Sequence, residues 1–156
     1  MYYVGIDIGG TNLKAGLVDE SCRIVAMKKM PLEFISMEQM GKTLAEMALA
    51  LVEENRVPKE QVASVGMGFP GPVDNRRGVV IKTVNIPIRF MPVAEMFQRY
   101  WDLPVYLGND ADCAAVGEFL FGAGRGCRDA AGVTLGTGVG GGVVLGGKLL
   151  TGYTGA

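Results

Sequence analysis

Apolar and polar residues alternate in three short runs near the start of the chain, Tyr2–Ile8, Leu13–Val18 and Arg23–Met30. Period-two alternation bounded by polar turn residues is typical of half-buried strands. The period then changes, because the apolar residues that follow Ser36 recur at spacings of three and four until about Asn55. This pattern predicts three consecutive strands and then an amphipathic helix with Ser36 as its N-cap.

The same two periods continue through the middle of the chain. They predict a buried strand, a helix, a strand and a second helix, which we place at Val62–Phe69, from Pro92, at Pro104–Leu107, and from Asn109 to about Phe121. A short strand at Val79–Ile81 is also expected in the loop before Pro92. The predicted order of elements is therefore βββαβαβα. Strands that alternate with helices indicate an α/β fold with parallel strand pairs.

A new series of hairpins is predicted after Gly124. It comprises the strands Ala130–Leu135, Val143–Leu145 and Lys148–Leu150, with Gly146 and Gly147 as a two-residue turn. The stretch "GVTLGT" in this series resembles "GIDIGG" near the N-terminus, since both are apolar alternations closed by small residues. We interpret the pair as an internal repeat, with a first lobe over residues 1–124 and the start of a second, truncated lobe over 125–156.

Composition narrows the classes of function. The 156 residues are 49% hydrophobic and 20% charged with a net charge of −1, which fits a soluble globular protein and favours neither nucleic acid nor a membrane as partner. The three cysteines form no CxxC pair, so we expect a reducing, cytoplasmic location. The chain has no histidine, which excludes serine and cysteine triads of the usual kind and leaves a carboxylate or a lysine as the base.

The stretch "DIGGTN" places a carboxylate directly before two glycines and a threonine. Asp7 alternates away from the core, and the glycines at positions 9 and 10 allow backbone N–H groups to approach an anion. A bound phosphate can lie near the Asp7 carboxylate when a divalent cation lies between the two negative groups. A tight hairpin in which Asp7 only caps the turn explains the same residues. The residues alone leave both interpretations open.

A second glycine-rich stretch contains a formal GxGxxG pattern at Gly136, Gly138 and Gly141. A dinucleotide fingerprint needs a helix directly after the glycines, whereas the residues that follow are β-branched and interrupted by a Gly-Gly turn. We therefore favour a second phosphate-holding hairpin. A glycine-rich β-turn without a ligand is the alternative.

Polar residues at the predicted strand ends are the remaining candidates. Asn109 and Asp110 lie between a strand and a helix, where open α/β sheets place their ligand groups, so Asp110 is a candidate general base. Asp112 is expected only to stabilise the N-terminus of that helix. Asn85 lies on a turn and carries an amide that can both donate to and accept from a sugar hydroxyl, although asparagine is also a common turn residue.

Together, "DIGGTN", "GFPGPVD", "GNDAD" and "LGTGVGGG" occur in this order, and the chain resembles the ROK family of sugar kinases and sugar-responsive repressors. The resemblance implies a ribonuclease-H-like fold, as in hexokinase, actin and the Hsp70 ATPase, with ATP and sugar bound between two duplicated lobes. It also implies an ATP-dependent hexose kinase similar to glucokinase.

The resemblance further implies a role for particular residues. Asp110 would accept the proton of the sugar hydroxyl, and Asp7 would reach Mg²⁺ through water. The sugar would be held by Gly71, Asn85, Asn109 and Asp110. The ATP phosphates would be contacted by Gly9, Gly10, Thr11, Asn12, Thr137 and Gly138.

The chain also departs from the family pattern. It stops at Ala156, before the segment in which the family has further sugar ligands and a zinc motif, so we expect an incomplete and inactive lobe that associates with itself as a homo-oligomer, most simply a dimer. Ile86, Pro87 and Ile88 stand where the family often has Gly-Trp. A sugar-sensing regulator without its DNA-binding part is the alternative function. We favour the kinase because Asp110 and both glycine hairpins are present.

Overall fold

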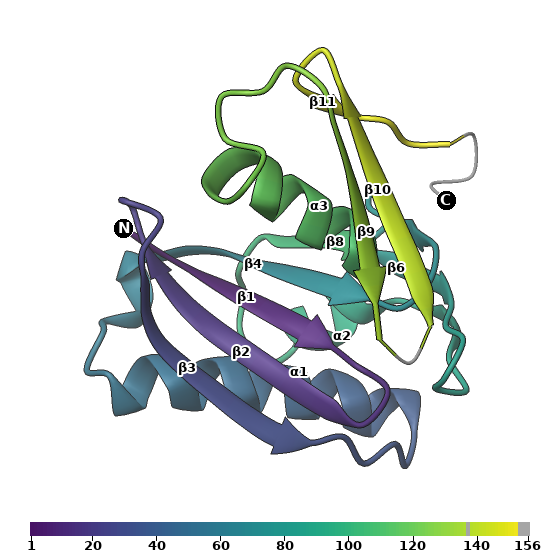
Figure 1. Cartoon of the computed structure of the whole chain (residues 1–156). Helices are drawn as coiled ribbons and strands as arrows, with labels where there is room; N and C mark the ends of the chain where they lie inside the picture. The colour runs from purple at the N-terminus through teal and green to yellow at the C-terminus, as the bar shows by residue number, and fades with distance from the viewer. Residues whose placement is uncertain (137, 153–156) are drawn as a thin grey trace.

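A five-stranded sheet lies at the centre of the computed structural model, which describes residues 1–136 and 138–152 (Figure 1). The strand order is β3-β2-β1-β4-β8. The first three strands form an antiparallel meander, and β4 and β8 run parallel to β1. Their bounds are β1 Tyr2–Ile8, β2 Asn12–Asp19, β3 Ile24–Pro31, β4 Val62–Phe69 and β8 Val105–Asn109.

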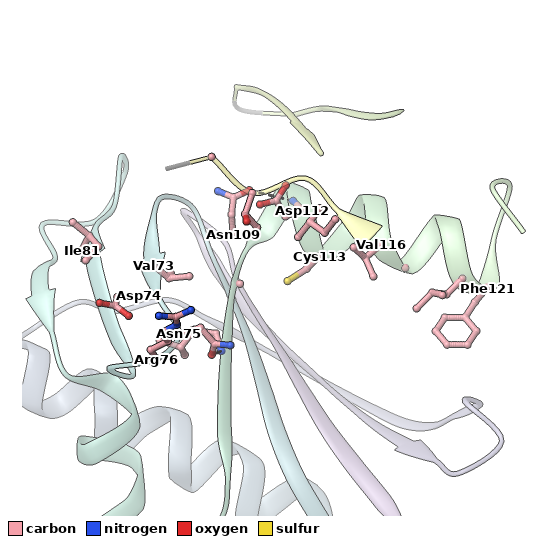
Figure 2. Close-up of a pocket in the computed structure, with 17 residues that line it drawn as sticks. Val73, Asp74, Asn75, Arg76, Ile81, Asn109, Asp112, Cys113, Val116 and Phe121 are labelled. Atoms are coloured by element: carbon pink, nitrogen blue, oxygen red, sulfur yellow. Dashed lines mark hydrogen bonds between the residues drawn. The ribbon is translucent and has the colours of Figure 1, made fainter. Parts of the chain in front are cut away.

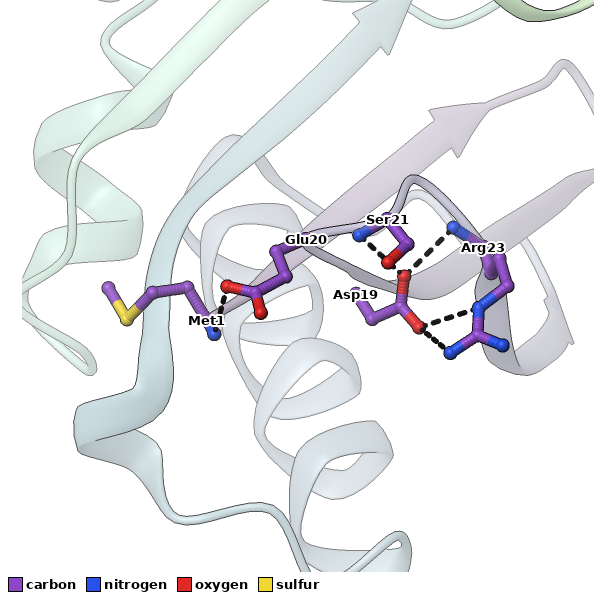
Figure 3. Close-up of polar contacts among 5 residues, drawn as sticks. All are labelled: Met1, Asp19, Glu20, Ser21 and Arg23. Atoms are coloured by element: carbon purple, nitrogen blue, oxygen red, sulfur yellow. Dashed lines mark hydrogen bonds and ion pairs between the residues drawn. The ribbon is translucent and has the colours of Figure 1, made fainter.

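The turn between β2 and β3 is organised by one carboxylate (Figure 3). Asp19 accepts the backbone N–H groups of Ser21 and Arg23 at 2.9 and 3.1 Å, and Arg23 Nη2 lies 2.8 Å from Asp19 Oδ2. The backbone hydrogen bond from Arg23 and the adjacent guanidinium lower the pKa of Asp19. The turn is therefore built for the ionised form of this side chain.

Helices cover one face of the sheet. The helix α1 (Met37–Glu54) begins as predicted, with Ser36 Oγ accepting the N–H of Gln39 at 3.1 Å. Its apolar stripe is buried against the sheet and includes Met40, Leu44, Met47 and Leu51. The short helix α2 (Val93–Gln98) packs beside α1, and a 3₁₀ turn at Lys59–Gln61 leads into β4.

The opposite face of the sheet is open in its middle. Gly5 pairs with Gly16 on one side and with Gly66 on the other, so three glycines lie in a row across adjacent strands. Met27 and Tyr106 continue the row at its two ends and are 66% and 57% exposed. The helix α3 (Asp110–Phe121) contacts β4 and β8 at one end of this face.

A second, three-stranded sheet of β5 (Val73–Asp74), β6 (Val79–Lys82) and β7 (Arg89–Met91) is inserted between β4 and α2. We call it the small sheet. Val80 and Met91 on its inner side are fully buried and join the main core. The predicted order of the main elements is confirmed. Of the insertion, the sequence predicts only the short strand Val79–Ile81, which is β6, because β5 and β7 are too short to show a period.

The last strands, β9 (Ala130–Leu135), β10 (Val139–Leu145) and β11 (Lys148–Leu149), form a sheet that packs on α3 (Figure 1). The predicted start of the second strand, Val143, was wrong by four residues, since the glycines before it pair in register with β9. Gly146 and Gly147 have φ of 57° and 78°, as a two-residue hairpin turn requires. Among the described residues, no helix has the length and apolar character needed to cross a membrane.

Candidate functional site

A cavity of about 650 Å³ extends over the open face of the main sheet, from the row of glycines in its middle to the carboxyl ends of β1, β4 and β8 at the start of α3. Asp7 and Asp110 both line it, together with Lys14, Gly68 and Cys113. The two carboxylates come together because Asp7 pairs with Gly68, Gly68 pairs with Gly108, and Asp110 begins α3 two residues later. The structure therefore places the predicted base and the predicted Mg²⁺-binding carboxylate on one cavity.

Asn109 holds the first turn of α3 and also contacts the predicted sugar loop. Its Oδ1 accepts the N–H groups of Ala111 and Asp112 at 2.9 and 3.2 Å, which makes it the N-cap. Its Nδ2 donates to the carbonyl oxygen of Gly71 at 3.4 Å. A side chain at position 71 would overlap the carbonyl oxygen of Lys82, so the loop approaches β6 as only glycine allows. Two of the predicted sugar residues are thus in direct contact.

The electrostatics of the first α3 turn depend on burial as well as on the helix. Partial burial and the nearby charge of Asp110 raise the pKa of Asp112. Burial and the charges of Asp112, Asp110 and Asp7 likewise raise the pKa of Cys113. Its sulfur lies beside Gly108, where an added Cβ would be 2.5 Å from Sγ. Cys113 is therefore a neutral thiol in the site, which no sequence motif indicated.

Asp7 faces away from the core, as predicted, between the buried Ile6 and Ile8. Its Oδ2 lies 3.2 Å from Lys14 Nζ on β2, and both side chains are 51% exposed. An ion pair this exposed adds little stability, so the carboxylate is free to change partner. Within the described residues no three His, Cys, Asp or Glu side chains form a metal cluster. One exposed carboxylate fits Mg²⁺ only when water and substrate phosphates supply the remaining ligands.

The β1–β2 turn carries the predicted phosphate contacts. The N–H of Gly9 donates to the carbonyl oxygen of Asn12 at 3.0 Å, so this donor is used within the hairpin. Asn12 Nδ2 donates to Thr11 Oγ1 at 2.9 Å. A Cβ on Gly10 would lie 3.4 Å from Asn85 Nδ2, which brings the third predicted sugar residue against this turn. Asn85 lines a separate cavity of about 510 Å³ within the loop 83–89.

The second glycine hairpin reaches the first turn of α3 from the other side. Cβ atoms on Gly140 and Gly142 would lie 2.8 Å from Ala111 Cβ and 2.9 Å from Asp112 Oδ1. At its tip the N–H of Gly136 donates to the carbonyl oxygen of Gly138 at 2.9 Å. The space around Gly138 is open, whereas the predicted ligand Thr137 lies outside the described residues.

A larger cavity of about 1000 Å³ lies beside the outer edge of β8 (Figure 2). Asn109, Asp112 and Cys113 line one side of it, and Asp74 and Asn75 line another. Asn75 was not predicted as a functional residue, because a single asparagine on a turn carries no motif. Its side chain nevertheless accepts a hydrogen bond from the backbone N–H of Leu107 on β8.

The chain matches the profile of the ROK family over residues 3–156. It belongs to the ROK family. Over 152 residues it is 40% identical to a glucokinase of Streptomyces coelicolor. The aligned region covers 97% of this chain and 46% of that protein. This ROK chain therefore spans about half the length of the curated relatives it matches.

Solved structures of ROK proteins have the same fold as this chain. A ROK family glucokinase from Streptomyces griseus, in complex with glucose and AMPPNP, superposes with a TM-score of 0.89 at 37% identity over 100% of this chain and 48% of that one. A ROK family transcriptional regulator, homologous to the E. coli MLC protein, superposes with a TM-score of 0.84 over 99% of this chain and 39% of that one, but at 20% identity it shares only the fold. The fold is thus that of the actin and hexokinase ATPases, as predicted.

Proposed function

We propose that this chain forms the sugar- and phosphate-binding lobe of an ATP-dependent hexose kinase similar to glucokinase. The observation that carries the proposal is the cavity shared by Asp7 and Asp110, together with the bond from Asn109, the residue before Asp110, to Gly71. A base, a carboxylate for a divalent cation and amide groups for hydroxyls are the parts that phosphoryl transfer to a sugar needs.

Asp110 acts as the base in this proposal. Its carboxylate accepts the proton of the hexose hydroxyl while the hydroxyl oxygen bonds to the γ-phosphorus of ATP and ADP leaves. Phosphoryl transfer usually has a loose transition state, so a weakly basic carboxylate suffices as the base late in the reaction. Asn109, Asn85 and Gly71 would hold the sugar in line for this attack.

The glycine hairpins would hold the nucleotide. Gly10, Thr11 and Asn12 on the first hairpin and Thr137 and Gly138 on the second are the proposed phosphate contacts, whereas Gly9 shapes its turn through the bond to Asn12. Asp7 would hold Mg²⁺ through water once Lys14 has moved aside. The cation would neutralise charge on the phosphate oxygens.

We also propose that residues 1–124 form the first lobe and that the sheet packed on α3 begins the second. Sugar and zinc ligands of the remaining lobe would complete the site, so the chain alone would not turn over. The five apolar residues on the outer side of β9 and β10 would mediate self-association as a dimer: Val133, Leu135, Val139, Val143 and Leu145 are 37–81% exposed. The unpaired cysteines favour a cytoplasmic location.

A chimera tests the proposed activity. Residues 1–156 would replace the matched half of the Streptomyces coelicolor glucokinase, and ATP-dependent phosphorylation would be measured over a panel of hexoses. We expect activity in the chimera, and its loss by about 10²–10⁴-fold with Asp110→Asn, while hexose affinity is retained.

The same substitution separates the two functions. A sugar-sensing regulator needs no base, so its hexose binding would be indifferent to Asp110→Asn and no turnover would be lost. Equal turnover by the parent chimera and the Asp110→Asn chimera would refute the kinase mechanism. Hexose titration of the 156-residue chain by NMR measures binding independently of the chimera's folding.

A further inference from the structure

Two asparagine side chains connect β8 with the small sheet and with the loop that leads into it (Figure 2). Asn75, on the turn between β5 and β6, accepts the backbone N–H of Leu107 through Oδ1 at 2.7 Å. Asn109, at the end of β8, donates through Nδ2 to the carbonyl oxygen of Gly71 at 3.4 Å. Neither bond belongs to a strand ladder, and each joins residues more than 30 positions apart along the chain.

The Asn75 bond satisfies a donor that the sheet itself leaves unpaired. β8 is an edge strand that pairs only with β4 in the main sheet. Leu107 is only 7% exposed, so water has little access to this part of the strand. A buried backbone N–H on an edge strand needs a hydrogen-bond acceptor from outside the sheet. The Asn75 side chain provides it and so attaches the small sheet to β8.

The turn that carries Asn75 is itself held in place. Asp74 Oδ1 accepts the N–H of Arg77 at 3.1 Å, which closes the turn. Gly78 has a φ of 66°, and its carbonyl oxygen accepts the N–H of Ala94 at the start of α2 at 3.1 Å. A movement of Asn75 would therefore be transmitted to the whole hairpin rather than absorbed by a loose turn.

Two proposed sugar residues, Gly71 and Asn85, lie on loops next to the small sheet. The N–H of Ile81 on β6 donates to the carbonyl oxygen of Pro72 at 3.0 Å, and Gly71 packs against the backbone of Lys82. The loop with Asn85 connects β6 to β7. The proposed base begins α3, and the hydrogen bonds that Asn109 Oδ1 accepts from Ala111 and Asp112 hold that turn without Asn75.

We propose that Asn75 is a positioning residue for hexose binding: its bond to Leu107 keeps the small sheet, with Gly71 and Asn85, at a fixed place relative to Asp110. This inference rests on the proposed hexose kinase function. Loss of the bond would misplace the sugar residues and leave the base and its helix cap intact. The hexose KM should therefore rise while kcat changes little.

The test uses the chimera with matched variants. Asn75→Leu keeps a similar shape and removes the acceptor, whereas Asn75→Asp keeps an acceptor oxygen. Asn55→Leu is the control, because Asn55 Nδ2 bonds to Leu51 O at 2.7 Å at the far end of α1. We expect Asn75→Leu to raise the hexose KM about tenfold, with kcat within about twofold of the parent. Asn75→Asp should restore the KM, and Asn55→Leu should leave it unchanged.

Hydrogen exchange of the isolated chain tests the bond without any activity. In Asn75→Leu the Leu107 amide should exchange faster, and the NMR signals of Gly71 and Asn85 should shift, with both effects reversed in Asn75→Asp. Unchanged exchange or unshifted Gly71 and Asn85 signals would overturn the positioning role. Faster exchange with an unchanged KM would also overturn it. A parent chimera without hexose phosphorylation would instead count against the proposed function, and the NMR outcomes would still decide the role of Asn75.

Discussion

The substitution Gly71→Ala should destabilise the chain more than any alanine placed in the open glycine row. An added Cβ would overlap the carbonyl oxygen of Lys82 and lie 3.2 Å from its carbonyl carbon and 3.3 Å from Thr83 Cα. All three are backbone atoms, so no side chain can turn away, and the end of β6 must move as a unit. Overpacking of this kind costs about 1–3 kcal/mol. A loss of 2 kcal/mol corresponds to a fall in Tm of roughly 4–8 °C for a chain of this length.

Thermal and urea unfolding, followed by circular dichroism, would measure the loss. Gly66→Ala is the matched control, since a Cβ at that position meets nothing within 4 Å and alanine restricts the unfolded chain more than glycine does. We expect Gly66→Ala to unfold within about 0.5 kcal/mol of the parent. Equal stabilities of the two variants would refute the inference that backbone contact, rather than chain flexibility, requires glycine at position 71.

Two further predictions concern the second half of the chain. Burial and the charge of Asp110 raise the pKa of Asp112 in the folded state, so the ionised side chain destabilises the fold at neutral pH. The substitution Asp112→Asn should therefore raise the Tm at neutral pH. This gain should disappear as the pH falls below about 3.8, the ordinary pKa, because Asp112 is then protonated in both the folded and the unfolded state. A Tm difference that is independent of pH would contradict this cause. Leu135 is 81% exposed on the outer side of β9, so Leu135→Ser should shift the proposed dimer toward monomer. Light scattering at a fixed concentration would measure the mass, and an unchanged mass would show that this surface is not the dimer interface.

Much of the fold follows from local signals in the sequence. The three N-terminal strands, α1 with its Ser36 cap and α3 with its Asn109 cap lie within a residue or two of the predicted bounds. Each has either a clear period over at least six residues or a side chain that can bond the first free N–H groups. β5 and β7 have neither, and β10 begins in a run of glycines that has no apolar period.

The candidate site was predictable only where motifs mark it. The proximity of Asp7 and Asp110 follows from parallel strand ends, which the alternation of strands and helices implied. The bond from Gly9 to Asn12 and the separate cavity of Asn85 depend on loop conformations that spacing does not determine. Asn75 and Cys113 act through contacts with residues distant in the chain, and a single sequence contains no signal for such pairs.

The first turn of α3 accounts for four of the 24 glycines in the sequence. Each of its four residues lies against a glycine from a neighbouring strand: Asp110 against Gly68, Ala111 against Gly140, Asp112 against Gly142 and Cys113 against Gly108. A side chain at any of the last three glycines would come within 3 Å of its neighbour, so β8 and β10 can approach the turn only without one. The glycines on β8 and β10 therefore act as spacers, because they allow both strands to approach the turn that carries the proposed base.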